Sequence, residues 1–192
     1  KLAGTVFVPL GGQLDALRRI KTPEELEKIA EAERIGDQAF AHLLGVLHPG
    51  MTEMDVVVEL ESHMKRNGAS GLSFETIAAS GPHSAMPHAA PTMRRLAAGD
   101  FLTVDFGCVY DGYCSDMTRT VVIGKASGRQ REIYATVLRA QEEALRAIRP
   151  GLTGAQVDEK AGSVIGQAGY GAFFGHGLGH SVGLYIQEEP RL

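Results

Sequence analysis

Apolar side chains recur at helical spacing through residues 23–47, the first strongly periodic segment of the chain. Thr22 stands before this segment, Pro23 at its first position, and Glu25 where a capping box requires an acid. A helix is therefore predicted to begin there. We expect its buried stripe to consist of Leu26, Ile29, Ala30, Leu43, Leu44 and Leu47.

The same pattern occurs twice along the chain. A second helix is predicted to follow Thr52 and to stop at Gly68, and two more helices are predicted over residues 128–148 and 155–169. The residues from Pro49 to Thr52 align with those from Pro150 to Thr153 at an offset of 101, which also places Gly68 on Gly169. The chain is therefore predicted to contain a duplicated helix-helix-strand unit, each half about 100 residues long.

Strands are predicted between the two helical pairs. Residues 72–81 form one apolar run, which a loop rich in proline and histidine follows. Residues 101–123 form two alternating runs around Asp111-Gly112, the strongest short hairpin signal. With those two residues in the turn, Tyr110 faces Tyr113.

Two acids fall inside this predicted hairpin. The register places Asp105 opposite Thr118 and Asp116 opposite Gly107, so the two acids are diagonal neighbours on one face, about 7–8 Å apart at Cα. Two converging carboxylates repel each other unless a proton or a cation lies between them, and a hard divalent cation is the candidate. In the alternative interpretation the acids face solvent or pair with Arg119.

Composition narrows the classes of partner. Apolar residues make up 44% of the 192 residues, charged residues 22%, and the net charge is −4. This balance argues against nucleic acid or an anionic membrane as a partner. No apolar run approaches the roughly 18 residues of a membrane span and the start lacks a signal-peptide layout, so a cytoplasmic protein is predicted. Cys108 and Cys114 should face opposite ways and form no disulfide.

Three histidines stand in unusual surroundings. His176 and His180 are four residues apart among glycines, and His88 lies in the proline-rich loop. Glycines allow close approach of a ligand, and imidazole is a ligand for Mn, Fe, Co or Zn. Because glycines disfavour a helix, we expect the pair at 176 and 180 on one face of a strand. A glycine-rich turn with surface histidines is the alternative.

The segments VDFGCVYDGYCSDMTRT, GHGLGHSVGL and EEP together resemble the pita-bread metallopeptidases, the group of methionine aminopeptidase, aminopeptidase P and prolidase. The resemblance runs from about Ile20 to the last residue. It implies an α/β (α+β) pita-bread fold with duplicated halves and a dinuclear metal centre between them. By this resemblance Asp105 would chelate one metal, Asp116 would bridge both, and His180 would bind the other.

The resemblance also implies a reaction. His88 would contact the substrate and stabilise the tetrahedral intermediate, and the additional His176 is typical of the Xaa-Pro enzymes, prolidase and aminopeptidase P. The implied cofactors are two divalent ions (Mn, Co, Zn or Fe, with Mn favoured), and the implied substrate is a peptide with proline in second position. A homodimer is compatible with this group.

Two departures from the family pattern bear on activity. Gln187 stands where the family usually has a histidine, and two glutamate ligands would fall beyond residue 192. We therefore expect residues 21–192 to be an incomplete catalytic domain, without the last hairpin of its second half, and residues 1–20 to be a linker from a preceding N-terminal domain. The alternative function is a catalytically inactive pita-bread module that binds peptides or other partners.

Overall fold

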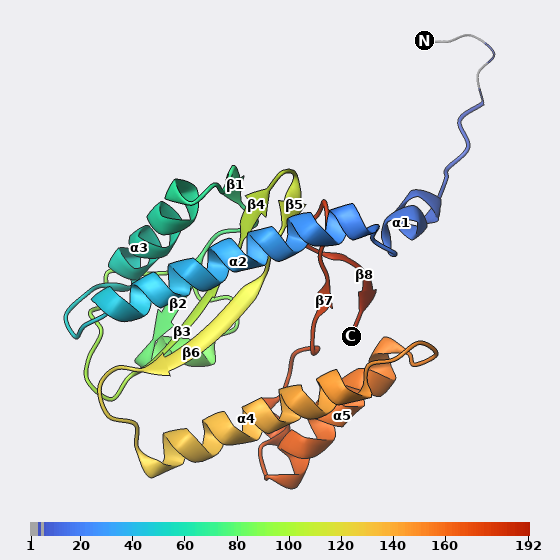
Figure 1. The fold of residues 1–192 in the computed structure, drawn as a ribbon. Coiled ribbons are helices and arrows are strands. Elements are labelled where there is room, and N and C mark those ends of the chain that lie inside the picture. Colours follow the sequence, from blue (N-terminus) through green and yellow to red (C-terminus); the bar gives the residue numbers. More distant parts are fainter. Residues whose placement is uncertain (1–3, 5) are drawn as a thin grey trace.

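The computed structural model describes Gly4 and residues 6–192 (Figure 1). Residues 1–3 and 5, part of the predicted linker, lie outside the described residues. The described part of the chain contains no helix that is both long and apolar enough to cross a membrane. The elements of the first half are α1 (Gln13–Arg18), α2 (Pro23–Val46), α3 (Glu53–Arg66), β1 (Gly71–Leu72), β2 (Ile77–Ser80), η1 (Gly81–Ala85), β3 (Phe101–Phe106), β4 (Cys108–Tyr110), β5 (Tyr113–Cys114) and β6 (Met117–Val122).

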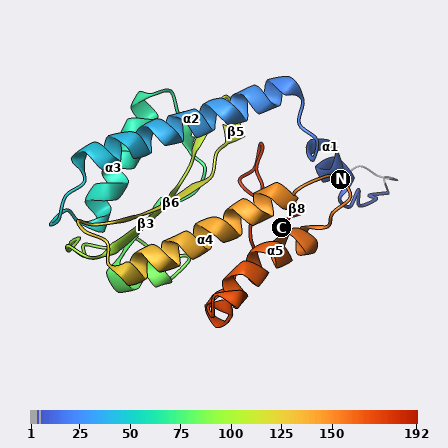
Figure 2. The same ribbon diagram turned by 60° about the horizontal axis from the view of Figure 1, so that its bottom comes forward.

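The second half repeats the helical pair of the first. Its elements are α4 (Gly128–Ala147), α5 (Gly154–Gln167), η2 (Gly171–Phe173), β7 (His180–Ser181) and β8 (Glu188–Arg191). The repeat extends to backbone geometry, because φ is +95° at Gly50 and +96° at Gly151, and it is also positive at Gly68 and Gly169. Figures 1 and 2 show the strands of the first half between its own helices and α4. The predicted duplication is confirmed for the helices.

Each long helix begins at a capping box. Thr22 and Glu25 exchange side-chain to backbone hydrogen bonds at the start of α2, and Thr52 and Asp55 do the same at α3. The first residues of α4 and α5 are capped by the same pair of hydrogen bonds. Because a capping box needs only residues three apart, these starts were readable from the sequence.

The predicted hairpin forms, but it is bent into two sheets. Asp105 pairs with Thr118, and Tyr110 pairs with Tyr113, as the register required. Strands β2, β3 and β6 form one sheet, and β1, β4 and β5 form another. Residues 72–81, expected as one strand, are likewise divided between β1 and β2, because their partner strand changes sheet at Gly107.

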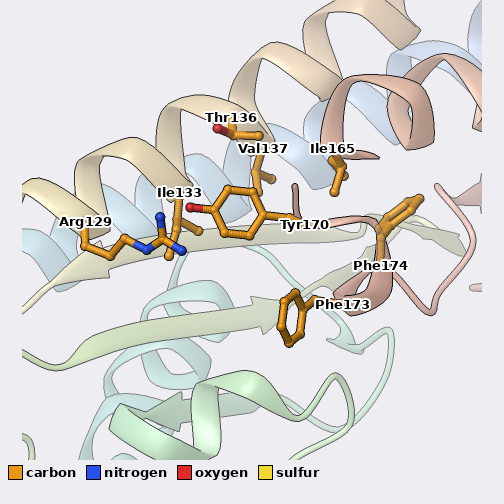
Figure 3. Close-up of a pocket in the computed structure, with 8 residues that line it drawn as sticks. All are labelled: Arg129, Ile133, Thr136, Val137, Ile165, Tyr170, Phe173 and Phe174. Atoms are coloured by element: carbon orange, nitrogen blue, oxygen red, sulfur yellow. The ribbon is translucent and has the colours of Figure 1, made fainter. Parts of the chain in front are cut away.

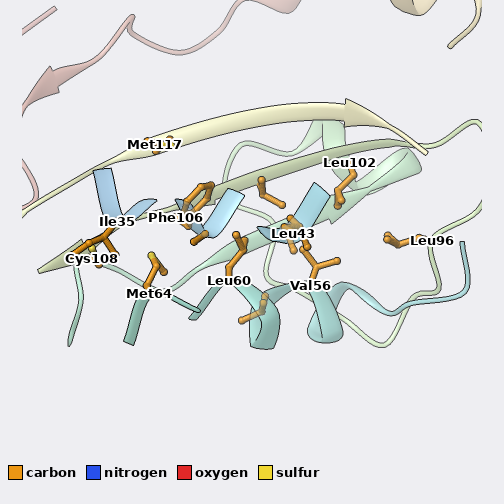
Figure 4. Packing of buried hydrophobic residues seen from close by; sticks show 14 of the residues in the cluster. Ile35, Leu43, Val56, Leu60, Met64, Leu96, Leu102, Phe106, Cys108 and Met117 are labelled. Carbon is orange, nitrogen blue, oxygen red and sulfur yellow. The ribbon is translucent and has the colours of Figure 1, made fainter. Parts of the chain in front are cut away.

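One face of the β2-β3-β6 sheet carries the main core. Val104 and Phe106 of β3 are fully buried against α2 and α3, together with Leu43 and Leu60 (Figure 4). Asp105 lies between those two buried residues in the strand, so it points to the opposite face. The core therefore fixes the direction of the first predicted acid.

The stripe predicted for α2 was partly wrong. Leu26 and Leu44 are more than half exposed, whereas small residues between them are buried. The buried positions of α2 are Ala32, Ile35, Gly36, Ala39 and Leu43. Small side chains let the helix approach the sheet closely: a Cβ at Gly36 would contact the Met117 side chain at 3.4 Å.

Gly107 makes the bend possible. A Cβ built there would lie 2.0 Å from the backbone oxygen of Ser115. Side-chain rotation cannot relieve this clash, because the oxygen belongs to the backbone. We expect Gly107→Ala to lower the free energy of unfolding by about 2–4 kcal/mol, because the two strands would have to separate. Denaturant unfolding measures the change.

The matched control is Gly45→Ala in α2, where an added Cβ meets nothing within 4 Å. It should leave stability within about 1 kcal/mol of the parent or raise it. An equal, small effect of both substitutions would contradict the close approach at Gly107.

Candidate metal centre

Asp105 and Asp116 occupy the open face of the bent hairpin. Thr118 Oγ1 donates a hydrogen bond of 2.9 Å to Asp105 Oδ1 across the β3–β6 pair. Asp116 precedes β6, and its backbone N–H donates to Glu33 Oε1 of α2 at 3.1 Å. Arg119, the alternative partner for these acids, instead forms an ion pair with Asp37 of α2 at 3.2 Å.

Ionisation is disfavoured for both carboxylates of the pair. Burial, and next the negative charge of Asp105, raise the pKa of Asp116 to about 6, while His180 opposes this shift. The pKa of Asp105 is also raised by burial, against the hydrogen bond from Thr118. The side chain of Asp116 is 25% exposed, so it is partly buried while one side of it still reaches solvent.

His180 faces Asp116 from the second half of the chain. Its Nε2 lies 3.4 Å from Asp116 Oδ2, and its Nδ1 lies 3.1 Å from the Ser181 carbonyl oxygen. A proton on Nδ1 directed at that carbonyl leaves the Nε2 lone pair free toward the acids. The Cys114 N–H donates to the Gly183 oxygen at 2.8 Å, which ties the His180 segment to the hairpin.

The other two histidines approach the acids from loops. The rings of His88 and His176 meet edge to face with centroids 5.6 Å apart. His88 is also close enough to Asp105 to oppose the rise in the pKa of that acid. The structure thus gathers all five predicted site residues, although they come from segments up to 92 residues apart.

The expected strand for the histidine pair was wrong. Only His180 lies in a strand, β7, whereas His176 lies in an irregular loop outside any strand. Gly175, Gly177 and Gly179 surround it without forming a strand ladder. His176 therefore reaches the site through its contact with His88, and not by sharing a strand face with His180.

The sequence interpretation missed Glu33. It lies on α2 beside the buried Ala32, and burial raises the pKa of its carboxyl, against the hydrogen bond from the Asp116 N–H. The sequence signal that could have identified Glu33 is an acidic residue next to the stripe of small residues on a helix. Three acids from two elements therefore surround the bend of the hairpin.

The two cysteines behave as predicted. Both are free and buried. Burial above all raises the pKa of the Cys108 and Cys114 thiols, which disfavours the thiolate.

The donor set suits a divalent cation, because carboxylate and imidazole ligands are those that Mn, Fe, Co and Zn accept. Two half-buried carboxylates whose ionisation is disfavoured offer a place where a cation can balance their charge. Within residues 4 and 6–192, however, no three His, Cys, Asp or Glu side chains are already grouped to hold an ion. The contacts are pairwise: Asp105 with Asp116, Asp116 with His180, and His88 with His176.

A cavity of about 430 Å³ lies elsewhere, between α4, α5 and η2 (Figure 3). Its walls are mainly apolar, and they include Ile133, Val137, Ile165 and Phe174. None of the five site residues lines it. Its lining carries no carboxylate or histidine, so we do not assign the metal chemistry to it.

Comparison with known proteins decides the family. Residues 27–192 match the model of metallopeptidase family M24. The chain belongs to this family. The Xaa-Pro dipeptidase of Pyrococcus furiosus is 44% identical over 186 residues, which cover 97% of this chain and 53% of that protein.

Solved structures agree with the pita-bread fold. The Xaa-Pro dipeptidase from Bacillus anthracis matches with a TM-score of 0.93 and 44% identity, over 96% of this chain and 52% of that one. The X-Pro aminopeptidase from Thermotoga maritima matches with a TM-score of 0.91 and 41% identity, over 93% and 51%. The M24 chain described here spans about half the length of these relatives.

The raised pKa of Asp116 makes the stability of the metal-free M24 chain depend on pH. Between its ordinary value of 3.8 and about 6, the folded protein keeps a proton that the unfolded chain has lost. The free energy of unfolding contributed by this group is therefore highest below 3.8 and falls as the pH rises through about 6. The shift corresponds to a loss of at most about 3 kcal/mol, which solvent screening of the partly exposed side chain reduces, and denaturant titration after treatment with a chelator measures it.

Asp116→Asn is the comparison for this prediction, because the amide cannot titrate. Its stability should lack this fall, and the difference between the two proteins should grow between pH 4 and pH 6, a window set by the pKa shift. Parallel pH profiles for both proteins would show that Asp116 is not the titrating group.

Proposed function

We propose that the protein containing this chain is a metal-dependent peptidase that cleaves the bond before proline in Xaa-Pro peptides. The observation that carries the proposal is the half-buried Asp105–Asp116 pair with His180 Nε2 facing it at 3.4 Å from Asp116. Membership of a metallopeptidase family and 44% identity to an Xaa-Pro dipeptidase support it.

Asp105, Asp116 and His180 are the residues that we propose as metal ligands. Asp105 would bind one ion, Asp116 would lie between two ions, and His180 would bind the other through Nε2, which is free of the Ser181 carbonyl. Two bound divalent ions, with Mn²⁺ favoured, would lower the pKa of a water nucleophile and polarise the scissile carbonyl. Below a pH of about 6, loading would have to displace the proton of Asp116, so metal affinity should fall in acid.

The chain's own groups handle the substrate. Water adds through oxygen to the carbonyl carbon, the C–N bond to the proline nitrogen breaks, and a water proton passes to that nitrogen. We assign His88 to the developing oxyanion, because its ring is exposed in a loop beside Asp105 and can donate a hydrogen bond there. His176 packs against His88 and would limit the directions that its ring can take.

Proline in second position is the proposed selectivity. Proline has no amide N–H and a fixed φ, so an apolar pocket of the right shape can select it. Hydrolysis of Ala-Pro by the natural gene product that contains these residues, lost with a chelator and restored by Mn²⁺, tests the proposal. Cleavage of Ala-Ala at an equal rate would contradict the selectivity.

An inactive peptide-binding module is the second candidate, and Gln187 is the observation that favours it. Gln187 is exposed, and its Oε1 accepts a hydrogen bond from Arg191 at 3.1 Å. The side-chain amide of glutamine carries no positive charge, whereas a protonated histidine can donate a hydrogen bond as a cation. Binding of Ala-Pro by the metal-loaded protein without any cleavage would favour this candidate.

Asp105→Ala should abolish metal binding with little loss of fold. The substitution removes one of two carboxylates that repel each other in the metal-free protein, so thermal stability without metal should stay the same or rise. Metal content by mass spectrometry and melting temperature are the two measurements.

Asp37→Ala is the control for this variant, because Asp37 is an exposed acid that pairs with Arg119 on the other side of the sheet. It should keep the full metal content. Retention of both ions by Asp105→Ala would refute the assignment of this acid.

His88→Ala should slow turnover by roughly 10²-fold or more while leaving the metal content intact, because it removes a donor to the oxyanion and no metal ligand. His48→Ala, which alters an exposed histidine on the loop after α2, serves as control. Loss of metal from His88→Ala would instead make His88 a ligand.

A further inference from the structure

Glu53 is a fully buried carboxylate at the first turn of α3, and it lies outside the metal centre. Its Oε1 accepts hydrogen bonds from the backbone N–H and the hydroxyl of Ser80, at 2.8 and 2.7 Å. Its Oε2 accepts from the backbone N–H and the hydroxyl of Thr92, at 2.9 and 2.6 Å. Four donors thus converge on one side chain.

The two sets of donors stand at the two ends of one loop. Ser80 is the last residue of β2, and Thr92 follows the segment 81–91, which carries His88. The backbone of α3 binds the far end as well, because the N–H of Met54 donates to the Thr92 oxygen at 3.2 Å. Glu53 therefore fixes the distance between the two ends of the His88 loop.

His88 depends on this loop for its position. Its side chain is exposed, and among the residues that the structure describes no hydrogen bond to its ring is found. The neighbouring Ala89 is buried, so the backbone beside His88 is held by packing. The placement of the ring near Asp105 therefore follows from the backbone of segment 81–91.

Each end of the loop is held differently. Ser80 pairs with Leu102 in the sheet and also accepts a hydrogen bond from Arg94 at 2.6 Å, so its position does not rest on Glu53 alone. For Thr92, the carboxylate of Glu53 is the acceptor for both the N–H and the hydroxyl, and the other hydrogen bonds of Thr92 come from the backbone N–H groups of Met54 and Arg94 to its oxygens. Weakening this contact should release the end of the loop that follows His88.

Only a carboxylate fits this position. An ionised carboxylate accepts through both oxygens, whereas a carboxamide turns two N–H donors toward one of the two donor pairs. Burial by itself would raise the pKa of Glu53, but the hydrogen bonds from Thr92 and Ser80 outweigh it and lower the pKa. The side chain is therefore ionised and satisfied, with His83 Nδ1 a further 3.4 Å neighbour of its Oε1.

We propose that Glu53 is a positioning residue for His88: by tying Thr92 to Ser80 it holds the loop so that the imidazole faces the substrate carbonyl beside Asp105. This role rests on the proposed function for its catalytic consequence. Its structural consequence, an ordered segment 81–91, does not depend on that function.

The test is a double-mutant cycle in the natural gene product, with metal loaded. Glu53→Gln should lower kcat on Ala-Pro by about tenfold or more with unchanged metal content, because a small misplacement of a catalytic group has effects of this size. In the His88→Ala background the same substitution should change kcat less than about twofold, since the group it positions is gone. Glu59→Gln, on the surface of the same helix, is the control.

Thr92→Val gives a second variant that keeps the carboxylate and the shape of the side chain but loses the 2.6 Å hydroxyl contact. It should show the same pattern with a smaller decrease in kcat, and it replaces Glu53→Gln in the cycle if that variant does not fold. Equal decreases in kcat with and without His88 would overturn the proposal, because Glu53 would then act on stability alone.

Hydrogen exchange separates this inference from the proposed function. If segment 81–92 exchanges faster in either variant, but the parent protein cleaves no Xaa-Pro peptide, the role of Glu53 in holding the loop is supported and the proposed peptidase function is rejected. If exchange in segment 81–92 is the same in the variants and in the parent, and the parent cleaves Xaa-Pro peptides, the peptidase function is supported and the role of Glu53 in holding the loop is rejected.

Discussion

The structure depends on one unfavourable contact, the approach of two carboxylates on a half-buried sheet face. Asp105 is directed there because its strand neighbours are buried against α2 and α3, and Asp116 is directed there by the bend of the hairpin. Burial, and next the negative charge of Asp105, disfavour ionisation of Asp116 in the metal-free protein and raise its pKa to about 6. In the proposed function a cation would balance the two charges, and this is the physical reason for assigning metal to the pair.

Three other groups hold the backbone around this contact and around the neighbouring His88 loop. Gly107 allows the two strands to meet at the bend, and Glu33 receives the Asp116 N–H from the opposite side. Glu53 closes the loop that carries His88. Each acts at a point where the chain leaves regular structure, which is where side chains of a functional site are usually placed.

The four long helices, the caps of α2 and α3 and the hairpin register followed from the sequence because their signals are local: a capping box joins residues three apart, and the hairpin turn spans two. The break between β1 and β2 could not be predicted, since it depends on the Ser115 backbone meeting Gly107. The α2 stripe was misplaced because hydrophobicity favours Leu26, whereas close packing selects Ala32 and Gly36. The five candidate site residues were predicted from motif and resemblance and stay a prediction, whereas the burial that makes Glu33 and Glu53 important arises only in the packed fold.

The central claim is that the Asp105–Asp116 pair holds metal in common with His180. Anomalous diffraction at the manganese edge, from Mn²⁺-loaded crystals of the natural gene product, tests it most directly. The account predicts two anomalous peaks, with Asp116 between them, Asp105 bonded to one and His180 Nε2 to the other. Manganese bound elsewhere in an enzyme that still cleaves Xaa-Pro peptides, with these three side chains free of metal, would contradict it.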